Sequence, residues 1–197
     1  MMKMRQILIQ YEIEHNLSHD EMIDLLQISR ATFFRLLSGK NENPKRGTLE
    51  RISKNLGIDV ESMLNEDSTY KPLIGNVKAG YDLYADQNIE RYIEVGVEDA
   101  KSGDYFLRVV GDSMIDDNIF EDDLIYVQQT PCISDGQIGI VMIGDEVTIK
   151  RVYFKDNMLI LKASNEKYAP KHFTMEEVEM IPIKIIGLAK FIRRDLI

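Results

Sequence analysis

A serine and a lysine are the residues of this sequence whose types and surroundings could do chemistry together. Ser113 follows an apolar run in Gly111-Asp112-Ser113-Met114, and Lys150 stands further along in Glu146–Arg151. A serine becomes a nucleophile when a nearby base takes its proton. Glycine permits the tight backbone turn that presents such a hydroxyl. We therefore interpret Ser113 as a nucleophile and Lys150 as its general base.

A lysine can act as a base near pH 7 only if it is largely neutral, and burial can lower a lysine pKa by about 3–5 pH units. Val147–Phe154 alternates as a strand does, so within this range Lys150 shares a face with Thr148, Val152 and Phe154, and no acid of the range lies on that face. The alternative is a turn serine and a solvent-exposed lysine. Composition alone favours that alternative, because lysines are usually exposed.

The order of three motifs favours the catalytic pair over a turn serine and an exposed lysine. Gly111–Met114 is followed by Glu121-Asp122-Asp123-Leu124-Ile125, and then by Val147-Thr148-Ile149-Lys150-Arg151. In this order the motifs resemble the LexA family of self-cleaving repressors, which includes the repressors of lambda-like phages and the UmuD-type proteins. The resemblance implies a Ser-Lys dyad that cuts its own chain at an upstream Ala-Gly bond.

Ala79-Gly80 is the Ala-Gly pair that stands upstream of the serine. We expect it to be the cleavage site, within a cleavage segment that spans residues 73–84. Small residues at the scissile bond would let the backbone approach the serine closely. Val77 is expected to fill an apolar pocket. An edge strand with a glycine bend is an alternative compatible with this role.

Composition excludes several other classes of protein. The chain has 197 residues, 44% of them hydrophobic, and a net charge of −9, which argues against a protein that coats nucleic acid non-specifically. Its single Cys132 cannot form an internal disulfide, which favours a reducing cytoplasm. The three histidines are scattered along the sequence, so no metal site is predicted. The sequence contains neither a Walker-type phosphate-binding loop nor a convincing dinucleotide-binding motif, so no cofactor is predicted. No apolar run is long enough for a membrane span.

Residues 2–64 carry a helical period, with apolar stripes at Met4, Ile7, Leu8 and Tyr11, at Met22, Leu25 and Leu26, and at Phe33, Leu36 and Leu37. Ser18 opens a capping box, and Ser29 caps the next helix, which we expect to end at Gly39. A fourth helix is predicted from Thr48 to Gly57 and a short fifth over 59–64. Only Gln27-Ile28 separates the second predicted helix from the third, and such a short link predicts a helix-turn-helix.

The segment Leu17–Lys40 resembles the DNA-binding domain of lambda-type and Xre-type repressors, although Ile23 and Gln27 stand where that family usually has a small residue and a glycine. Five basic residues and one acid lie between Arg30 and Arg46, which indicates a confined anion-binding face. Side chains of the third helix are expected to contact bases, and flanking residues to contact phosphates. The predicted DNA-binding residues are Ser18, His19, Ser29, Arg30, Ala31, Phe34, Arg35 and Lys40. The alternative is a helical bundle with solvated arginines.

After Gly80 the period changes to two and turn residues recur, so little helix is expected. Strands are predicted over 105–110, 123–128, 137–143, 146–154, 158–162 and 181–192. The acidic loop Asp116–Asp123 is interpreted as solvated rather than as a metal site. The apolar stretch Ile181–Ile192 is expected to be partly core and partly a dimer interface.

The predicted fold class is therefore α + β in two domains, an all-α lambda-repressor-like helix-turn-helix bundle and a mostly-β LexA-like peptidase domain. The expected boundaries are 1–66 for DNA binding, 67–78 for a linker and 79–197 for self-cleavage and dimerisation.

The sequence predicts a cytoplasmic repressor that binds operator DNA as a homodimer and inactivates itself at Ala79-Gly80. The family resemblance implies the RecA filament on single-stranded DNA as the trigger. Two alternatives stay open. One is a repressor with an idle peptidase, controlled by an antirepressor or a ligand. The other is a processing peptidase that acts on other proteins.

Overall fold

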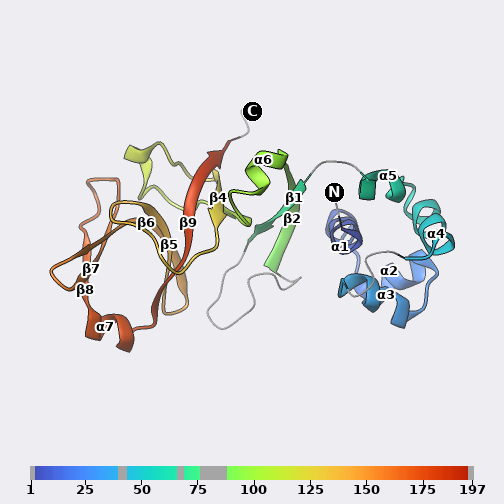
Figure 1. The fold of residues 1–197 in the computed structure, drawn as a ribbon, viewed down its shortest axis with the longest axis horizontal. Coiled ribbons are helices and arrows are strands. Elements are labelled where there is room, and N and C mark those ends of the chain that lie inside the picture. The colour runs from blue at the N-terminus through green and yellow to red at the C-terminus, as the bar shows by residue number, and fades with distance from the viewer. Residues whose placement is uncertain (1–2, 40–43, 66–68, 76–87, 195–197) are drawn as a thin grey trace. The chain divides into compact units, whose positions relative to one another are not determined.

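The computed structural model describes residues 3–39, 44–65, 69–75 and 88–194. Internal contacts divide the chain into two compact units, one of Met1–Lys71 with Glu90–Ala100 and one of Pro72–Ile89 with Lys101–Ile197. Over these described ranges, the first unit holds a bundle of five helices, α1 to α5, and the second is built on a β-sheet (Figure 1). This order of elements confirms the predicted α + β fold class.

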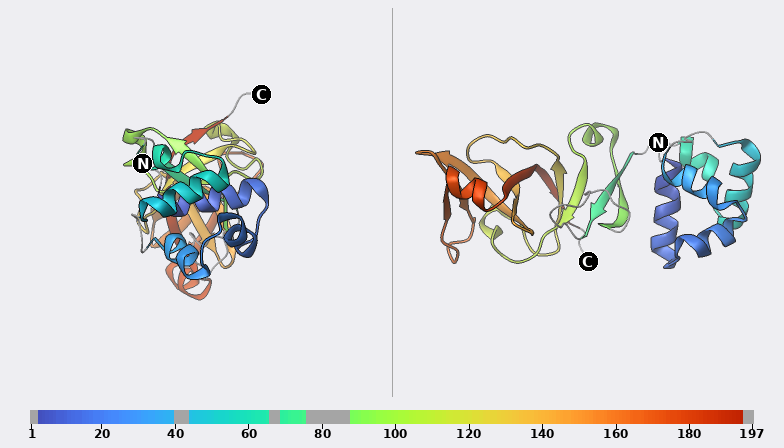
Figure 2. Two further views of the ribbon diagram at one scale, coloured as in Figure 1. Left: turned by 90° about the vertical axis from the view of Figure 1, so that its right-hand side faces the viewer. Right: turned by 90° about the horizontal axis from the view of Figure 1, so that it is seen from below.

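Helices make up the described part of the N-terminal bundle (Figure 2). They are α1 (Met4–His15), α2 (His19–Leu26), α3 (Arg30–Leu37), α4 (Arg46–Leu56) and α5 (Val60–Asn65). The predicted caps of α2 and α3 are confirmed. Ser18 accepts a hydrogen bond from Glu21 N, Glu21 closes the capping box, and Ser29 accepts from Thr32 N. Oxygen acceptors at these ends satisfy backbone N–H groups that no helical carbonyl can reach.

One predicted helix boundary is displaced. α4 begins at Arg46 rather than Thr48, because the carbonyl of Lys45 already accepts from Thr48 N at 2.7 Å and Leu49 N at 3.2 Å. α3 ends at Leu37 with Ser38 as its cap, and Gly39, with φ +69°, supplies the predicted left-handed stop. The predicted end of α4 at Gly57 is confirmed, with φ +69°.

The turn between α2 and α3 accommodates Gln27, one of the two residues that depart from the family pattern. Gln27 takes the left-handed conformation, with φ +52°, at a position where glycine is common. Side chains of α4 then bind the exposed carbonyls of this turn: Arg51 donates to Gln27 O at 3.2 Å and Asn55 to Leu26 O at 3.0 Å. The turn is thus stabilised from the neighbouring helix.

Most of the core of the bundle lies where the apolar period predicts it. Leu25 is 37% exposed, because it faces away from the face that buries Met22 and Leu26. Tyr11 is half-buried and stacks on His15 at 3.9 Å between ring centroids. The fully buried side chains also include Ile9 and Val60, which no predicted stripe contained; the others are Ile7, Leu8, Met22, Leu26, Phe33, Leu36 and Ile52.

A nine-stranded sheet has the order β2-β1-β3-β4-β9-β5-β6-β7-β8. Its strands are β1 (Thr69–Ile74), β2 (Ile89–Val95), β3 (Tyr105–Arg108), β4 (Leu124–Gln128), β5 (Ile138–Ile143), β6 (Glu146–Lys155), β7 (Met158–Lys162), β8 (Lys171–Thr174) and β9 (Ile183–Arg193). All six predicted strands are present, with ends that differ by a few residues. Strands β2 and β8 were not predicted, and β1 was expected only under the alternative of an edge strand with a glycine bend.

Two short helices were also missed, α6 (Val97–Ala100) and α7 (Met175–Met180). The sequence carries a signal for α7, since Thr174 and Glu177 form a capping box. Strand β1 lies within the predicted linker over 67–78, and it pairs in parallel with β3 through Leu73 and Ile74. The domain boundaries stay a prediction.

The sheet bends around β9, which lies between β4 and β5 (Figure 1). The register shifts at Tyr126/Val127 on one side of β9 and at Ile140/Val141 on the other. Such bulges bend a strand and increase its twist. The predicted strand over 181–192 is thus an internal strand of the core. Among the described helices, none is long and apolar enough to cross a membrane.

Candidate peptidase site and DNA-binding face

Ser113 lies in a turn between β3 and a short 3-10 helix, η2 (Ile115–Asp117). Gly111 has φ +82°, a conformation that side-chain-bearing residues rarely adopt. Met114 anchors the other side of the serine in the core, at 2% exposed. The turn therefore presents a half-buried serine hydroxyl between a glycine hinge and a buried methionine.

Lys150 reaches Ser113 from β6. Its Nζ lies 2.8 Å from Ser113 Oγ, 2.8 Å from Ile149 O and 3.0 Å from Thr148 Oγ1. Thr148 and Lys150 share a face, as the two-residue period predicts. Phe154, expected on that face, is 46% exposed near the end of the strand. The two residues that sequence patterns singled out are thus within hydrogen-bonding distance.

Two effects lower the pKa of Lys150 from its usual value of 10.5. Burial disfavours the charged ammonium, and the positive charge of Lys171 adds repulsion. Lys171 belongs to β8, a strand that the sequence pattern did not predict. Both effects increase the fraction of lysine that is neutral and can accept a proton.

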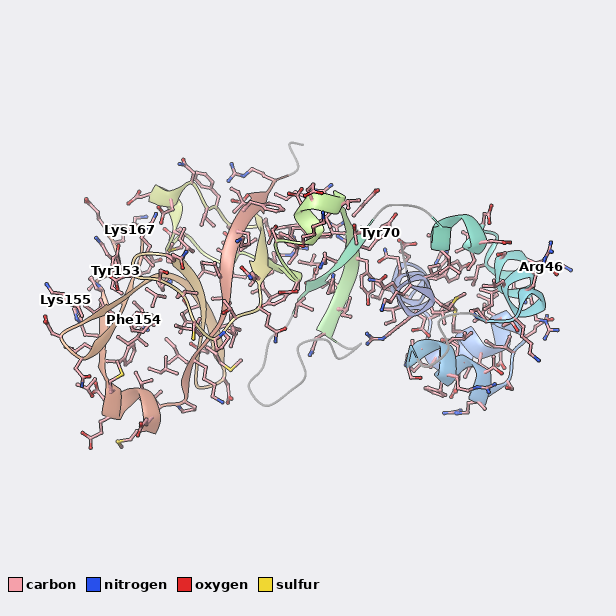
Figure 3. All side chains as sticks on the ribbon, in the orientation of Figure 1. Arg46, Tyr70, Tyr153, Phe154, Lys155 and Lys167 are labelled. Atoms are coloured by element: carbon pink, nitrogen blue, oxygen red, sulfur yellow. The ribbon has the colours of Figure 1, made fainter. Side chains whose placement is uncertain are left out.

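A loop after β7 holds the residue that precedes the serine. Asn165, 5% exposed, donates from Nδ2 to Asp112 O at 2.8 Å and Asp112 Oδ2 at 3.3 Å. The hydroxyl of Tyr168 donates to Asp112 Oδ1, and Lys167 Nζ lies 3.3 Å from Oδ2. Lys167 itself is 73% exposed and extends from the loop (Figure 3). The hydrogen bond from Tyr168, followed by the contacts with Lys167, holds the pKa of Asp112 below its usual range despite desolvation.

A second ion pair joins the serine turn to the lysine strand. Asp117 accepts from Arg151 Nη2 at 2.5 Å and from the hydroxyl of Ser164. Burial alone would raise the pKa of Asp117, but the hydrogen bonds from Arg151 and Ser164 outweigh it and lower the pKa. Because Arg151 follows Lys150, this pair fixes the register of the strand against the turn.

The acidic loop is not solvated throughout, which corrects one expectation. Asp123 is 2% exposed and accepts two hydrogen bonds of 2.6 Å from the guanidinium of Arg194. Its Oδ2 also accepts from Phe120 N at 2.8 Å. A buried carboxylate must be paired in this way, so Asp123 ties the loop to the end of β9.

A cavity of about 380 Å³ opens beside Ser113. Strand β1 contributes Ile74 and Gly75 to its lining, and the β5–β6 turn contributes Asp145 and Glu146. The predicted cleavage segment enters this cavity with its first residues. Val77, Ala79 and Gly80 lie outside the described residues, as does Lys40.

The predicted DNA contacts fall on two helices of the bundle. Ala31, Phe34 and Arg35 are exposed on α3, while Arg30 pairs with Asp20 at 2.7 Å. Arg35 donates to Ala31 O and Thr32 Oγ1, both at 3.3 Å.

The residues predicted to bind phosphate differ from one another in exposure and in the contacts that they already make. Ser18 and Ser29 are exposed, but both are engaged as caps. His19 is half-buried against Glu12 Oε1 at 2.8 Å. Arg46, at the start of α4, is 85% exposed (Figure 3).

A helix-turn-helix bundle joined to a β-domain of this kind defines a class, DNA-binding regulators that carry a peptidase-like domain. A model of the S24-like peptidases matches residues 72–187, and a model of the Cro/C1-type helix-turn-helix DNA-binding domain matches residues 4–65. The LexA repressor of Hahella chejuensis is 35% identical over 170 residues, which is 82% of each chain. That of Vibrio atlanticus is 33% identical over 86% of this chain and 84% of its own.

The LexA repressor of Pectobacterium carotovorum is 36% identical over 72% of this chain and 74% of its own. The chain therefore belongs to the LexA repressor family of DNA-binding proteins with a self-cleaving S24-type serine peptidase domain.

Proposed function

We propose that this protein is a transcriptional repressor that inactivates itself by cutting the bond between Ala79 and Gly80, with Ser113 as nucleophile and Lys150 as general base. The observation that carries the proposal is the 2.8 Å separation of Lys150 Nζ and Ser113 Oγ beside a cavity lined by Gly75. Ala79 follows Gly75 by four residues. At about 3.3–3.6 Å per residue, that length lets the scissile carbonyl reach the serine.

The contacts of Lys150 suit a neutral amine. A neutral amine has two N–H donors and one lone pair, and oxygen atoms of Ile149 and Thr148 can accept both protons. The lone pair then remains for the hydroxyl proton of Ser113. An ammonium would have a third proton to direct at Ser113 and could not act as a base.

The reaction then follows from these positions. As Lys150 takes the hydroxyl proton, Ser113 Oγ attacks the carbonyl carbon of Ala79, and backbone N–H groups stabilise the oxyanion. The bond to Gly80 breaks as its nitrogen receives the proton from Lys150. Water then hydrolyses the ester between Ser113 and Ala79, which leaves a carboxylate on Ala79 and restores the serine.

DNA binding is assigned to residues 1–66, with α3 in the major groove. The exposed Arg35 and Phe34 supply a guanine-reading guanidinium and an apolar contact for a thymine methyl. A homodimer through residues 79–197 would join two half-sites and raise the effective concentration of the second. The half-buried apolar side chains of β9, Ile186 and Leu188, offer surface for that contact.

Cutting at Ala79–Gly80 separates the DNA-binding part from the dimerising part in covalent terms. We propose the RecA filament on single-stranded DNA as the trigger, in line with the SOS role of the family. The filament would act by favouring the arrangement in which Ala79 lies against Ser113.

The test is self-cleavage of the purified chain between pH 7 and 10, with and without activated RecA filament, followed by mass spectrometry. We expect fragments 1–79 and 80–197, formed faster as pH rises because more Lys150 is neutral. Ser113→Ala and Lys150→Ala should each slow the reaction by at least about 10³-fold. Selection of bound DNA from a random pool tests the operator claim separately.

A chain that stays intact at every pH, even with the filament, would remove the peptidase from the proposal. It would favour the repressor controlled by an antirepressor or a ligand. Cleavage of added substrate without operator preference would instead favour a processing peptidase.

A further inference from the structure

The boundary between the two compact units does not coincide with the proposed cleavage bond. A cut at Ala79–Gly80 produces residues 1–79 and residues 80–197. The second unit nevertheless includes Pro72–Ile74 of the N-terminal fragment, and the first includes Glu90–Ala100 of the C-terminal fragment. Each unit is therefore completed by a segment from the other fragment.

The segment that the N-terminal fragment contributes is the buried half of β1. Leu73 and Ile74 are fully buried and pair in parallel with Phe106 and Leu107 of β3. β1 lies between β2 and β3 in the sheet, so its backbone is used on both edges. Withdrawal of β1 would leave unpaired backbone and apolar surface in the peptidase unit.

The segment that the C-terminal fragment contributes is β2. Its Tyr92 N donates to Gln10 Oε1 of α1 at 2.7 Å, and Tyr92, Ile93 and Val95 are each at most 8% exposed. From α1, Gln6 Nε2 also donates to Tyr70 O at 3.2 Å. The helical unit thus binds backbone groups of both strands that flank the cleavage segment.

From this exchange of segments we propose that the two products stay associated after the bond breaks, with β1 of residues 1–79 held in the sheet of residues 80–197 as an added strand. This inference rests on the proposed cleavage site. Bond breakage and separation are then two steps, and withdrawal of β1 sets the rate of the second. In this complex the edge of β3 binds β1 as an extended apolar peptide. The peptide is recognised by main-chain pairing and by burial of its two side chains, Leu73 and Ile74.

The experiment separates retention from self-cleavage. In a Ser113→Ala chain, a recognition sequence for a site-specific protease is inserted between Ala79 and Gly80, and the chain is cut under native conditions. Size-exclusion chromatography and native mass spectrometry then follow the products at low micromolar concentration. We expect both fragments in one peak, at the elution volume of the uncut chain, and their separation in urea.

Fragments that separate within one native column run would overturn the proposal. The engineered cut needs no activity from the dyad. Failure of the natural chain to cut itself would therefore contradict the proposed function and leave this result unaffected.

Variants of β1 identify what holds the fragments together. Ile74→Val removes one buried methyl group, and Leu73→Ala removes more. After the cut and dilution to nanomolar concentration, both should separate faster than the parent, Leu73→Ala by at least 10-fold. The matched control is Arg91→Ala, an exposed position on β2. Equal separation rates in all four chains would overturn the role of β1, and Ile74→Val keeps the test valid if Leu73→Ala does not fold.

Discussion

At the scale of single residues, the pattern of the sequence predicts the proposed reacting groups but not the residues that hold them. Ser113 stands in a glycine turn, and Lys150 shares a strand face with Thr148; both facts follow from local spacing. Asn165 contacts Asp112 across more than fifty residues of chain. No local period links such positions, so only the folded sheet reveals them.

The lowered pKa of Lys150 predicts a pH-dependent stability. Because the folded pKa lies below the unfolded value of about 10.5, the unfolded chain binds more protons between these two values, and stability rises with pH across that window. Below the folded pKa the cost of the buried charge is fully present. The free energy of unfolding of Lys150→Met, relative to that of the parent, should therefore be highest at pH 7, and this advantage should disappear towards pH 10.

Urea unfolding of Lys150→Met and of the parent at pH 7, 8, 9 and 10 measures this difference. Lys155→Met, an exposed lysine on the same strand, controls for loss of a positive charge. A stability difference that is the same at all four pH values would show that burial of Lys150 does not depress its pKa.

The contacts of Asp112 predict a positioning role for Asn165. Asn165→Ala removes the donor to the carbonyl that precedes Ser113, and a displaced nucleophile should slow self-cleavage about 10- to 100-fold. Lys167→Ala is the matched control, since Lys167 contacts the same carboxylate from an exposed position and should change the rate little. Rates come from the disappearance of the intact chain at pH 9. Equal rates for the two variants would argue against the positioning role.

At the scale of elements, caps and periods predict the helices better than the strands. Ser18, Ser29 and Gly57 mark helix ends because each supplies a local acceptor or a left-handed stop. β1 was expected only as an alternative, because Pro72 interrupts it and polar residues precede it, features typical of a linker. Only pairing of Leu73 and Ile74 with β3, which is remote in sequence, makes it a strand.

The close packing around β9 predicts a sensitive glycine. A Cβ at Gly187 would lie 2.3 Å from Val127 Cγ1 and 3.1 Å from Tyr105 Oη. Gly187→Ala should therefore lower the free energy of unfolding by about 1–3 kcal/mol. Gly47→Ala, in α4 with open space around the added carbon, should change it by less than about 1 kcal/mol. Thermal unfolding followed by circular dichroism compares the two, and an unchanged midpoint for Gly187→Ala would contradict the packing argument.

At the scale of the whole molecule, an acidic chain carries a basic segment on its helical unit. The net charge of −9 opposes general attraction to DNA, so binding must depend on the few cations of that segment. Composition and the helix-turn-helix spacing were sufficient to predict this division. They could not predict that Arg30 is paired with Asp20, because that contact depends on how α2 and α3 pack.

Arg35 is therefore expected to contribute most to base recognition. Arg35→Ala should weaken binding to a selected operator by about 1–3 kcal/mol and relax its sequence preference. Lys54→Ala, exposed on α4, is the control for loss of one positive charge. Fluorescence anisotropy at two salt concentrations measures both, and equal losses for the two variants would mean that α3 does not read the bases.

The proposed nucleophile, the proposed base and the strand that leads into the cavity all belong to one polypeptide. A catalyst whose substrate is a bond of its own backbone turns over once. Recovery after a signal then depends on ribosomes rather than on resetting existing molecules. The loss of repression would follow the first-order self-cleavage of the existing molecules. The return of repression would follow the rate of new synthesis, so two independent rates would determine the time course of one response.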